Sequence, residues 1–202
     1  MNRERWQELM AVLALPPSDE CFDLLSSAYA ENHRHYHTPR HIESMLRHMD
    51  TVAELAEHPA EVELAIWFHD AVYRPFSSTN ELDSAKWAHQ FLSDNGFNKS
   101  GIDRVYNLIM ATRHHCDVVT RDEQLLVDID LSILGAPADI YDQFEQNVRK
   151  EYQQVPSIIF RKKRKEILKS FLSRDSIYYL TYFREKYEQA AKLNLERAIV
   201  QL

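Results

Sequence analysis

The amino-acid sequence predicts an all-α protein, a compact array of roughly eight to ten helices joined by short loops. Three observations support this fold class. Apolar residues recur at helical spacing along most of the 202-residue chain. No segment alternates strictly between apolar and polar residues, as a half-buried strand does. Prolines and capping residues also stand where helices are expected to begin.

Five helices are predicted in the first half of the chain. They cover residues 3–14, 18–30, 38–57, 59–70 and 78–95. The polar stretch 31–37 has no apolar face and is predicted to be a loop. Thr38 and Pro39 form a start signal, as does Pro59. Ser78 to Glu81 are predicted to form a capping box, and Gly96 ends that helix.

Five more helices are predicted in the second half. They cover residues 102–113 and 123–134, two segments that begin at Pro137 and Pro156, and the tail 176–202. Gly135 ends the second of them. Because no repeat or domain boundary is visible, we predict one domain over residues 1–202. Its core would cover about residues 20–150, with C-terminal helices 156–202 packed on it.

The composition excludes several classes of protein. Hydrophobic residues make up 45% and charged residues 27%, as in soluble globular proteins. With only three glycines, neither a Walker-type phosphate loop nor a dinucleotide fingerprint can form. A net charge of -7 argues against nucleic acid as a partner. Cys21 and Cys116 signal neither a zinc cage nor a disulfide framework.

Neither a signal peptide nor a membrane span is visible in the sequence. The N-terminus lacks an apolar signal core, and no apolar run approaches the roughly 18 residues that a span requires. We therefore expect a cytoplasmic protein with no membrane association, and leave open whether it forms homo-oligomers.

His69 and Asp70 are the most informative residues, because they end the apolar run of the fourth predicted helix. Unpaired charge is costly to bury, so a ligand that binds the pair is expected. Other metal-type side chains precede and follow them along the chain: His37, His41, His114, His115, Asp128 and Asp130. Imidazole and carboxylate are groups that hold divalent metals through nitrogen and oxygen.

Helical geometry limits how these residues can meet. His37 and His41 are four apart and share a face if both are helical. His69 and Asp70 diverge by about 100° on a helix, so they share an ion most easily if it sits beyond the helix end. Asp128 and Asp130 point about 200° apart, so one is expected to be solvated and the other buried.

The order of these residues resembles the HD-domain superfamily of metal-dependent phosphohydrolases, whose skeleton is a histidine, then His-Asp, then a distal aspartate. The resemblance covers about residues 20 to 200. The segments that carry it look like an uncharacterised bacterial branch of that superfamily: Tyr36 to Ile42, Phe68 to Tyr73, Asn80 to Ala85, and Asp128 to Gly135.

The resemblance implies an α-helical fold, a divalent metal (Mn, Co, Ni, Fe, Zn or Mg) and hydrolysis of a phosphate ester, usually of a nucleotide. Matched residue by residue, the metal ligands would be His41, His69, Asp70 and Asp130. Asp128 is the alternative distal ligand. His37, His114, His115 and Asp128 are candidates for outer contacts or for a second metal.

The expected reaction needs a group that orients water and cations that bind phosphate. Asp70 and Glu81 are the candidate catalytic residues, although Glu81 fits the capping box equally well. The nearest cations along the sequence are Arg40, Arg74, Lys86 and Arg113. The partner would be a small-molecule phosphate substrate.

Alternatives remain open at this point. His37 fits a plain loop histidine, and His114 and His115 suit the negative end of a helix. The basic run 161–165 is interpreted as the solvated face of a helix whose apolar residues pack inward, namely Ile158, Ile159, Ile167, Leu168, Phe171 and Leu172. The alternative function is a non-catalytic helical module that senses a ligand or binds a partner, with a structural or vestigial metal site. RNA contact through Arg161 to Lys165 is a third hypothesis and ranks last.

Overall fold

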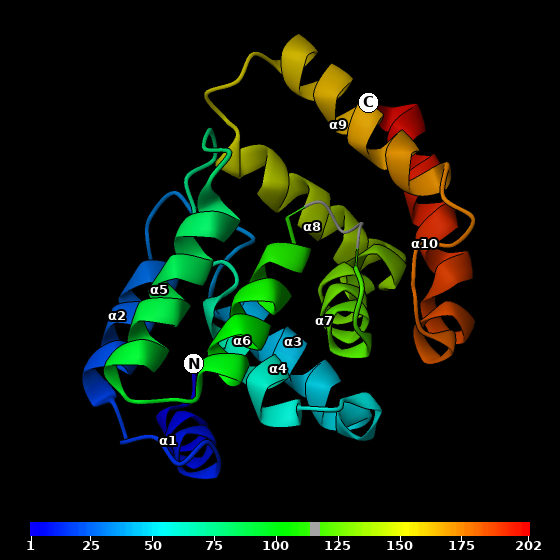
Figure 1. Cartoon of the computed structure of the whole chain (residues 1–202). Helices are drawn as coiled ribbons and strands as arrows, with labels where there is room; N and C mark the ends of the chain where they lie inside the picture. The colour runs from blue at the N-terminus through cyan, green and yellow to red at the C-terminus, as the bar shows by residue number, and fades with distance from the viewer. Residues whose placement is uncertain (114–117) are drawn as a thin grey trace. The chain divides into compact units, whose positions relative to one another are not determined.

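The computed structural model describes residues 1–113 and 118–202. Within them the chain forms ten α-helices and two short 3-10 helices, and no strand, which confirms the predicted all-α class (Figure 1). The chain divides into two compact units, Met1–Val127 and Asp128–Leu202. Each unit is described by itself.

The first unit contains the helices that carry most of the predicted site. They are α1 (Arg3–Val12), α2 (Asp19–Tyr29), α3 (Pro39–Val52), η1 (Ala53–Leu55), α4 (Pro59–Phe68), α5 (Asn80–Asp94), α6 (Lys99–Ala111) and the first part of α7 (Arg121–Leu131). Both proline start signals are confirmed, because Pro39 and Pro59 are the first residues of α3 and α4. The helix predicted to run to residue 57 ends at Val52 and continues as η1.

Helix α4 is the centre of the first unit and contacts α1, α3, α5 and α6 (Figure 1). Its residues 64–68 are fully buried, as expected of a helix that is apolar on all sides. Trp6 of α1 packs edge-on against Trp67 with ring centroids 5.5 Å apart. The position that follows Phe68 therefore lies in the interior, and His69 occupies it.

The predicted capping box before α5 does not form. The helix begins at Asn80, with Thr79 at the N-cap position, and no side chain caps it. The Asn80 side chain instead accepts from the backbone N–H of Arg74 at 3.1 Å and donates to its carbonyl at 2.9 Å. The N-terminus of α5 is therefore fixed by hydrogen bonds between Asn80 and the preceding loop, and not by the predicted capping box.

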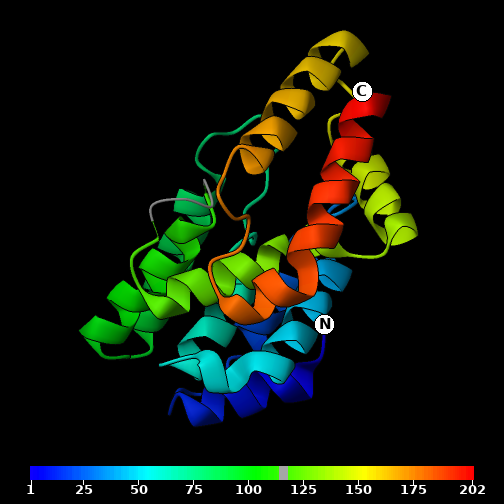
Figure 2. The same ribbon diagram turned by 90° about the vertical axis from the view of Figure 1, so that its right-hand side faces the viewer.

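The second unit contains the end of α7, η2 (Ser132–Gly135), α8 (Ala138–Glu151), α9 (Ser157–Leu172) and α10 (Thr181–Gln201). Helix α10 packs on η2 and on α9, and Figure 2 shows α9 and α10 side by side. Helix α10 approaches η2 so closely that Gly135 leaves no room for a side chain. A Cβ atom added at Gly135 would lie 2.8 Å from the carbonyl oxygen of Tyr187 in α10. Asn194 of α10 stabilises this contact by donating to the carbonyls of Leu134 and Ala136, each at 2.9 Å.

None of the helices in the described part of the chain combines the length and the apolar character needed to cross a bilayer.

Candidate metal centre

Two histidines from different helices meet in the interior of the first unit. His41 is the third residue of α3, and His69 is the residue that caps the C-terminus of α4. Their Nε2 atoms lie 3.2 Å apart, and both residues are buried. Two imidazole nitrogens bound to one ion at about 2.1 Å, at angles of about 90° to 110°, would stand about 3.0 to 3.4 Å apart. The pair therefore has the spacing of two ligands of one ion.

The tautomer of His69 leaves its Nε2 atom available for a metal. Its Nδ1 atom lies 2.9 Å from the carbonyl oxygen of Ile66, one turn earlier. A carbonyl only accepts, so Nδ1 carries the proton and the Nε2 atom of the neutral ring carries a lone pair. A backbone partner on the distal nitrogen is the usual device that orients a metal-binding histidine.

Asp70 adds a carboxylate to this pair. Because α4 ends at Phe68, Asp70 lies beyond the end of the helix. This is the position from which His69 and Asp70 were expected to bind one ion most easily. Its Oδ2 atom is 3.0 Å from Nε2 of His69 and 3.7 Å from Nε2 of His41. His37, from the loop before α3, brings its Nε2 atom to 3.9 Å from the same oxygen. Three imidazoles thus face one carboxylate oxygen.

This arrangement keeps Asp70 ionised. Burial acts to raise the pKa of Asp70, but the charges of His69 and His37 in their protonated state and a hydrogen bond from protonated His69 outweigh it, so the pKa lies below its usual value. A metal ion would replace these protons at the imidazole nitrogens and leave the rings neutral. An ionised carboxylate and neutral imidazoles are the donor set for a divalent first-row metal held through oxygen and nitrogen. The residues present fit such an ion.

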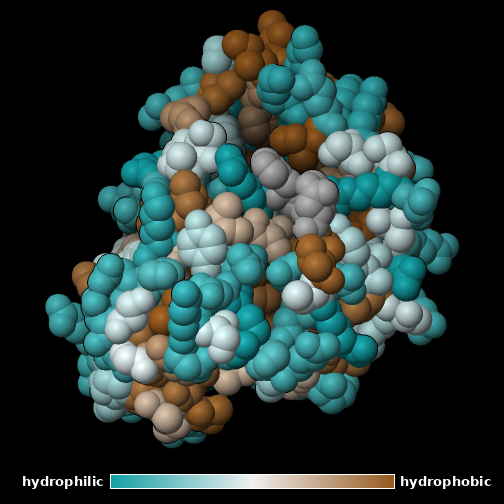
Figure 3. Space-filling view, viewed as in Figure 1, coloured by the Kyte–Doolittle hydropathy of each residue, from teal (hydrophilic) through white to brown (hydrophobic). Residues whose placement is uncertain are grey.

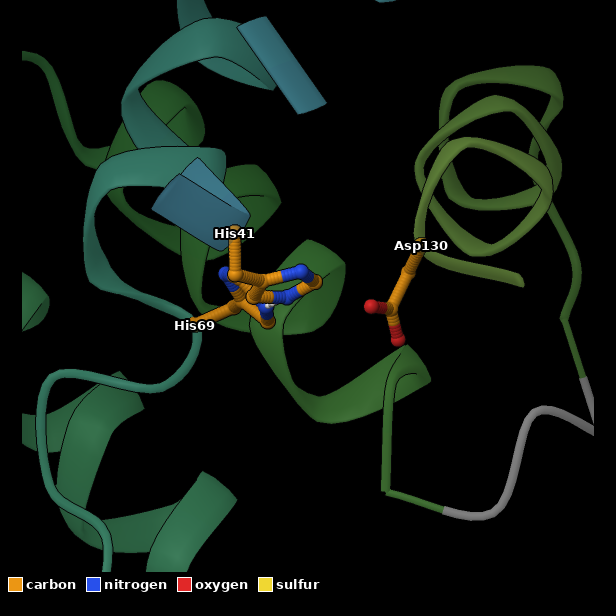
Figure 4. A group of neighbouring side chains, drawn as sticks. All are labelled: His41, His69 and Asp130. Carbon is orange, nitrogen blue, oxygen red and sulfur yellow. Dashed lines mark hydrogen bonds between the residues drawn. The ribbon is translucent and has the colours of Figure 1, made fainter. Parts of the chain in front are cut away.

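Asp130, the predicted distal aspartate, lies on α7, in the part of the helix that belongs to the second unit. The start of α7 is anchored to the first unit, because Asp122 accepts from the backbone N–H groups of Glu57 and His58 at 2.7 and 2.9 Å. Asp130 lies two turns further along the same helix. His41, His69 and Asp130 each offer one ligand atom, these atoms lie within 4.8 Å of one another, and the group could hold a metal ion (Figure 4).

Arg34 holds the loop before α3 against the segment that carries Asp70. Its side chain is fully buried and donates to the carbonyls of Asp70 at 2.7 Å, Ala71 at 3.0 Å and His37 at 3.3 Å. Its Nε atom donates to Glu31 at 3.0 Å. One guanidinium therefore joins the backbone at two of the site residues, His37 and Asp70.

Sequence reasoning missed Arg34. The only signal was an arginine in a loop next to several histidines, and that pattern is common on surfaces.

The aromatic ring of Tyr73 reinforces the same junction. The ring of His37 stacks on the ring of Tyr73, with centroids 4.1 Å apart. The Nε2 atom of His33 is hydrogen-bonded to the carbonyl oxygen of Tyr73 at 2.8 Å. Helix α5 holds the segment from the other side: Ser84 accepts from the backbone N–H of Val72 at 3.0 Å. The loop after His69 and Asp70 is thereby fixed by side chains from two directions.

The other predicted site residues of the first unit occupy more exposed positions. Glu81 is the second residue of α5 and is partly exposed. Arg40 and Lys86 are exposed, Arg74 is paired with Asp83, and Arg113 donates to the carbonyl of Ser78 at 3.1 Å. His114, His115 and Cys116 lie outside the described residues.

Asp128 is buried within the second unit and has a backbone partner for each oxygen. It accepts from the N–H groups of Tyr179 at 2.8 Å and Leu180 at 2.7 Å, at the start of α10. Burial raises its pKa to about 7, although these two hydrogen bonds act to lower it. The expectation that one aspartate of the pair is buried holds for Asp128, while Asp130 is partly exposed.

The chain matches no protein-family model, no curated protein and no solved structure.

Proposed function

We propose that this protein is a metal-dependent phosphohydrolase of the HD type that cleaves a phosphate ester of a nucleotide or a similar small molecule. The observation that carries the proposal is the pair of Nε2 atoms of His41 and His69, 3.2 Å apart, with a carboxylate oxygen of Asp70 at 3.0 Å from the second. The resemblance of the ordered histidines and aspartates to the HD-domain superfamily supports it.

In this proposal His41, His69, Asp70 and Asp130 hold the ion. A bound divalent ion supplies two things: it lowers the pKa of a water molecule, and it offsets the charge of the phosphate in the transition state. His69 contributes a lone pair at Nε2 because the Ile66 carbonyl holds its proton at Nδ1. Arg34 and Tyr73 keep His37 and Asp70 in place, so the ligands need not rearrange when the ion binds.

The attacking water needs an acceptor for its proton. Asp70 remains ionised at neutral pH and presents Oδ2 to the imidazoles, so its second oxygen is the candidate acceptor. Glu81 is the second candidate, since it is not engaged as a helix cap. Arg40, Arg74, Lys86 and Arg113 are the candidate cations for the phosphate. Among the described residues Arg74 is paired with Asp83, and Arg113 donates to the carbonyl of Ser78.

Phosphate release tests the proposal. Purified protein supplied in turn with Mn²⁺, Co²⁺, Ni²⁺ or Mg²⁺ is expected to release phosphate from at least one member of a nucleotide panel. His69→Ala and Asp70→Ala are each expected to abolish the release. His89→Ala, a change at an exposed histidine of α5, serves as the matched control and should keep full activity.

Activity that survives both site substitutions would overturn the proposal. Metal binding without turnover of any nucleotide would instead indicate the non-catalytic module, in which the ion is structural.

A further inference from the structure

Helix α9 directs isoleucines to solvent, contrary to the expectation that they pack inward. Ile158 is 84% exposed, Ile159 is 54% exposed and Ile167 is 46% exposed. The same expectation is confirmed for Leu168 and Phe171, which are buried together with Phe160. An apolar side chain left in water forgoes the free energy of burial, so exposed isoleucines at a helix start call for an explanation.

A line of lysines continues from Ile158 along the same face. At 100° per residue, Lys162, Lys165 and Lys169 all project within about 40° of Ile158. Lys162 and Lys169 are exposed, Lys165 is partly exposed, and none of the three has an ion pair in the described part of the chain. Arg161 is exposed beside them. The acidic residue of the helix, Glu166, is paired with Lys163 at 3.0 Å.

Arg164, the fourth basic residue of the run 161–165, has a structural role in α9. Arg164 makes two hydrogen bonds with Glu145 of α8, at 2.9 and 2.7 Å. Arg164 therefore anchors α9 inward, while Lys162, Lys165 and Lys169 face outward. Figure 3 shows hydrophobic side chains at the top of the view, over the start of α9, next to hydrophilic ones.

We infer that this face of α9, defined as Ile158, Ile159, Arg161, Lys162, Lys165 and Lys169, docks on the surface of an anionic lipid bilayer. A helix that lies on a membrane buries apolar side chains among the acyl chains and places lysines at the headgroups. Lysine suits this position because its long apolar stem can lie along the bilayer while its charge stays in water. The contact is peripheral and needs no spanning helix.

Charge complementarity favours this partner. The protein as a whole carries a net charge of -7, so anionic surfaces repel most of it, and the unpaired lysines of α9 form a local exception. Nucleic acid would pair with the lysines equally well, but it offers nothing to Ile158 and Ile159. A requirement for both the isoleucines and the lysines is therefore the mark of a bilayer.

Co-sedimentation of the full-length protein with lipid vesicles tests the inference. Vesicles of phosphatidylcholine with about 30% phosphatidylglycerol are expected to bind it at about 0.1 M salt, whereas pure phosphatidylcholine vesicles are not. Binding is expected to weaken at about 0.5 M salt because the headgroup charge is screened.

Two double variants separate the contributions. Lys162→Glu/Lys169→Glu and Ile158→Ser/Ile159→Ser are each expected to lower the vesicle partition coefficient about ten-fold or more. Arg47→Glu/Lys99→Glu makes the same change in net charge at exposed positions of the first unit and should bind within about two-fold of the unmodified protein. Far-UV circular dichroism and thermal unfolding establish that each variant is folded.

Equal binding to neutral and anionic vesicles, or either α9 variant binding like the unmodified protein, would overturn the inference. So would binding to an RNA oligonucleotide that is lost with the lysines but is indifferent to the isoleucines. The test does not involve the metal centre, so its result is independent of the phosphohydrolase proposal.

Discussion

The Nε2 atom of His41 faces the Nε2 atom of His69 at 3.2 Å, with the proton of His69 held at Nδ1 by the Ile66 carbonyl. Neutral rings fit this spacing when Nε2 of His41 donates to Nε2 of His69, and the same spacing suits two ligands of one divalent ion. The carboxylate oxygen of Asp70 beside them supplies the negative charge that such a cation requires.

The first prediction concerns the metal ligands. His41→Ala and His69→Ala are each expected to weaken Mn²⁺ binding by more than the roughly 10- to 100-fold that changes in outer contacts cost, because each removes a ligand. Isothermal titration of the metal-free protein measures this. At a Mn²⁺ concentration of about 100 times the dissociation constant, the ion should stabilise the unmodified protein by about 2.7 kcal/mol. The same ion concentration should leave the thermal midpoint of both variants unchanged.

The second prediction concerns Arg34. Arg34→Met keeps the length of the side chain but leaves the buried carbonyls of Asp70 and Ala71 without their donor. We expect a loss of about 3 kcal/mol in the free energy of unfolding and a roughly 10- to 100-fold loss of metal affinity. Arg34→Lys should have a free energy of unfolding and a metal affinity between those of the unmodified protein and Arg34→Met, because one ammonium group cannot donate to all the acceptors of the guanidinium.

Arg47→Met, at an exposed position of α3, is the control for Arg34 and should change stability by less than about 0.5 kcal/mol. Urea unfolding and metal titration measure the two effects separately. Unchanged metal affinity in a folded Arg34→Met variant would show that Arg34 does not position the ligands.

The third prediction concerns Gly135. Gly135→Ala places a methyl group 2.6 Å from Cβ and 2.8 Å from the carbonyl oxygen of Tyr187, so the backbones of η2 and α10 must separate. We expect a loss of about 1 to 3 kcal/mol in the free energy of unfolding. The comparison is Gly96→Ala, where no atom lies within 4 Å and the cost, about 1 kcal/mol, comes from the positive φ of 72° alone.

A double variant tests whether the cost of Gly135→Ala arises from the backbone of Tyr187 or from its side chain. Tyr187→Ala leaves the Tyr187 backbone in place, so it should not rescue Gly135→Ala. Rescue would show that the strain lies in the Tyr187 ring rather than in the approach of the two backbones.

The fourth prediction concerns the pH dependence of stability. Burial acts to raise the pKa of Glu188, but hydrogen bonds from the backbone of Ile177 and from Lys192, Ser176 and Tyr178 outweigh it, so the pKa is lowered in the folded protein. A lowered pKa stabilises the fold above the unfolded value of about 4.3, and this stabilisation is lost as pH falls through the folded value.

Glu188→Gln should therefore remove part of the decline in stability below about pH 4.5, and urea unfolding at several pH values between about 3 and 7 measures it. Glu185→Gln, at an exposed position one turn earlier in α10, should retain the acid dependence of the unmodified protein. An identical decline in the Glu188 variant would contradict the assignment.

Local signals in the sequence were sufficient for the fold class and for several element boundaries. Proline at a first helical position is pre-organised and lacks only an N–H that would be unpaired anyway, so Pro39 and Pro59 predicted the starts of α3 and α4. The apolar run before His69 predicted a buried helix that ends on ionisable groups. These are properties of neighbouring residues, and neighbours in sequence determine them.

Tertiary structure decided what depends on residues far apart in the chain. The side chain of Asn80, the first residue of α5, hydrogen-bonds to the backbone of Arg74. Arg34 donates to the carbonyls of Asp70 and Ala71, and Gly135 lies against the backbone of Tyr187. The isoleucines of α9 face outward because Phe160, Leu168 and Phe171 take the inner face. Periodicity indicates that a helix has an apolar side, but only packing selects which side chains fill the space against the next helix.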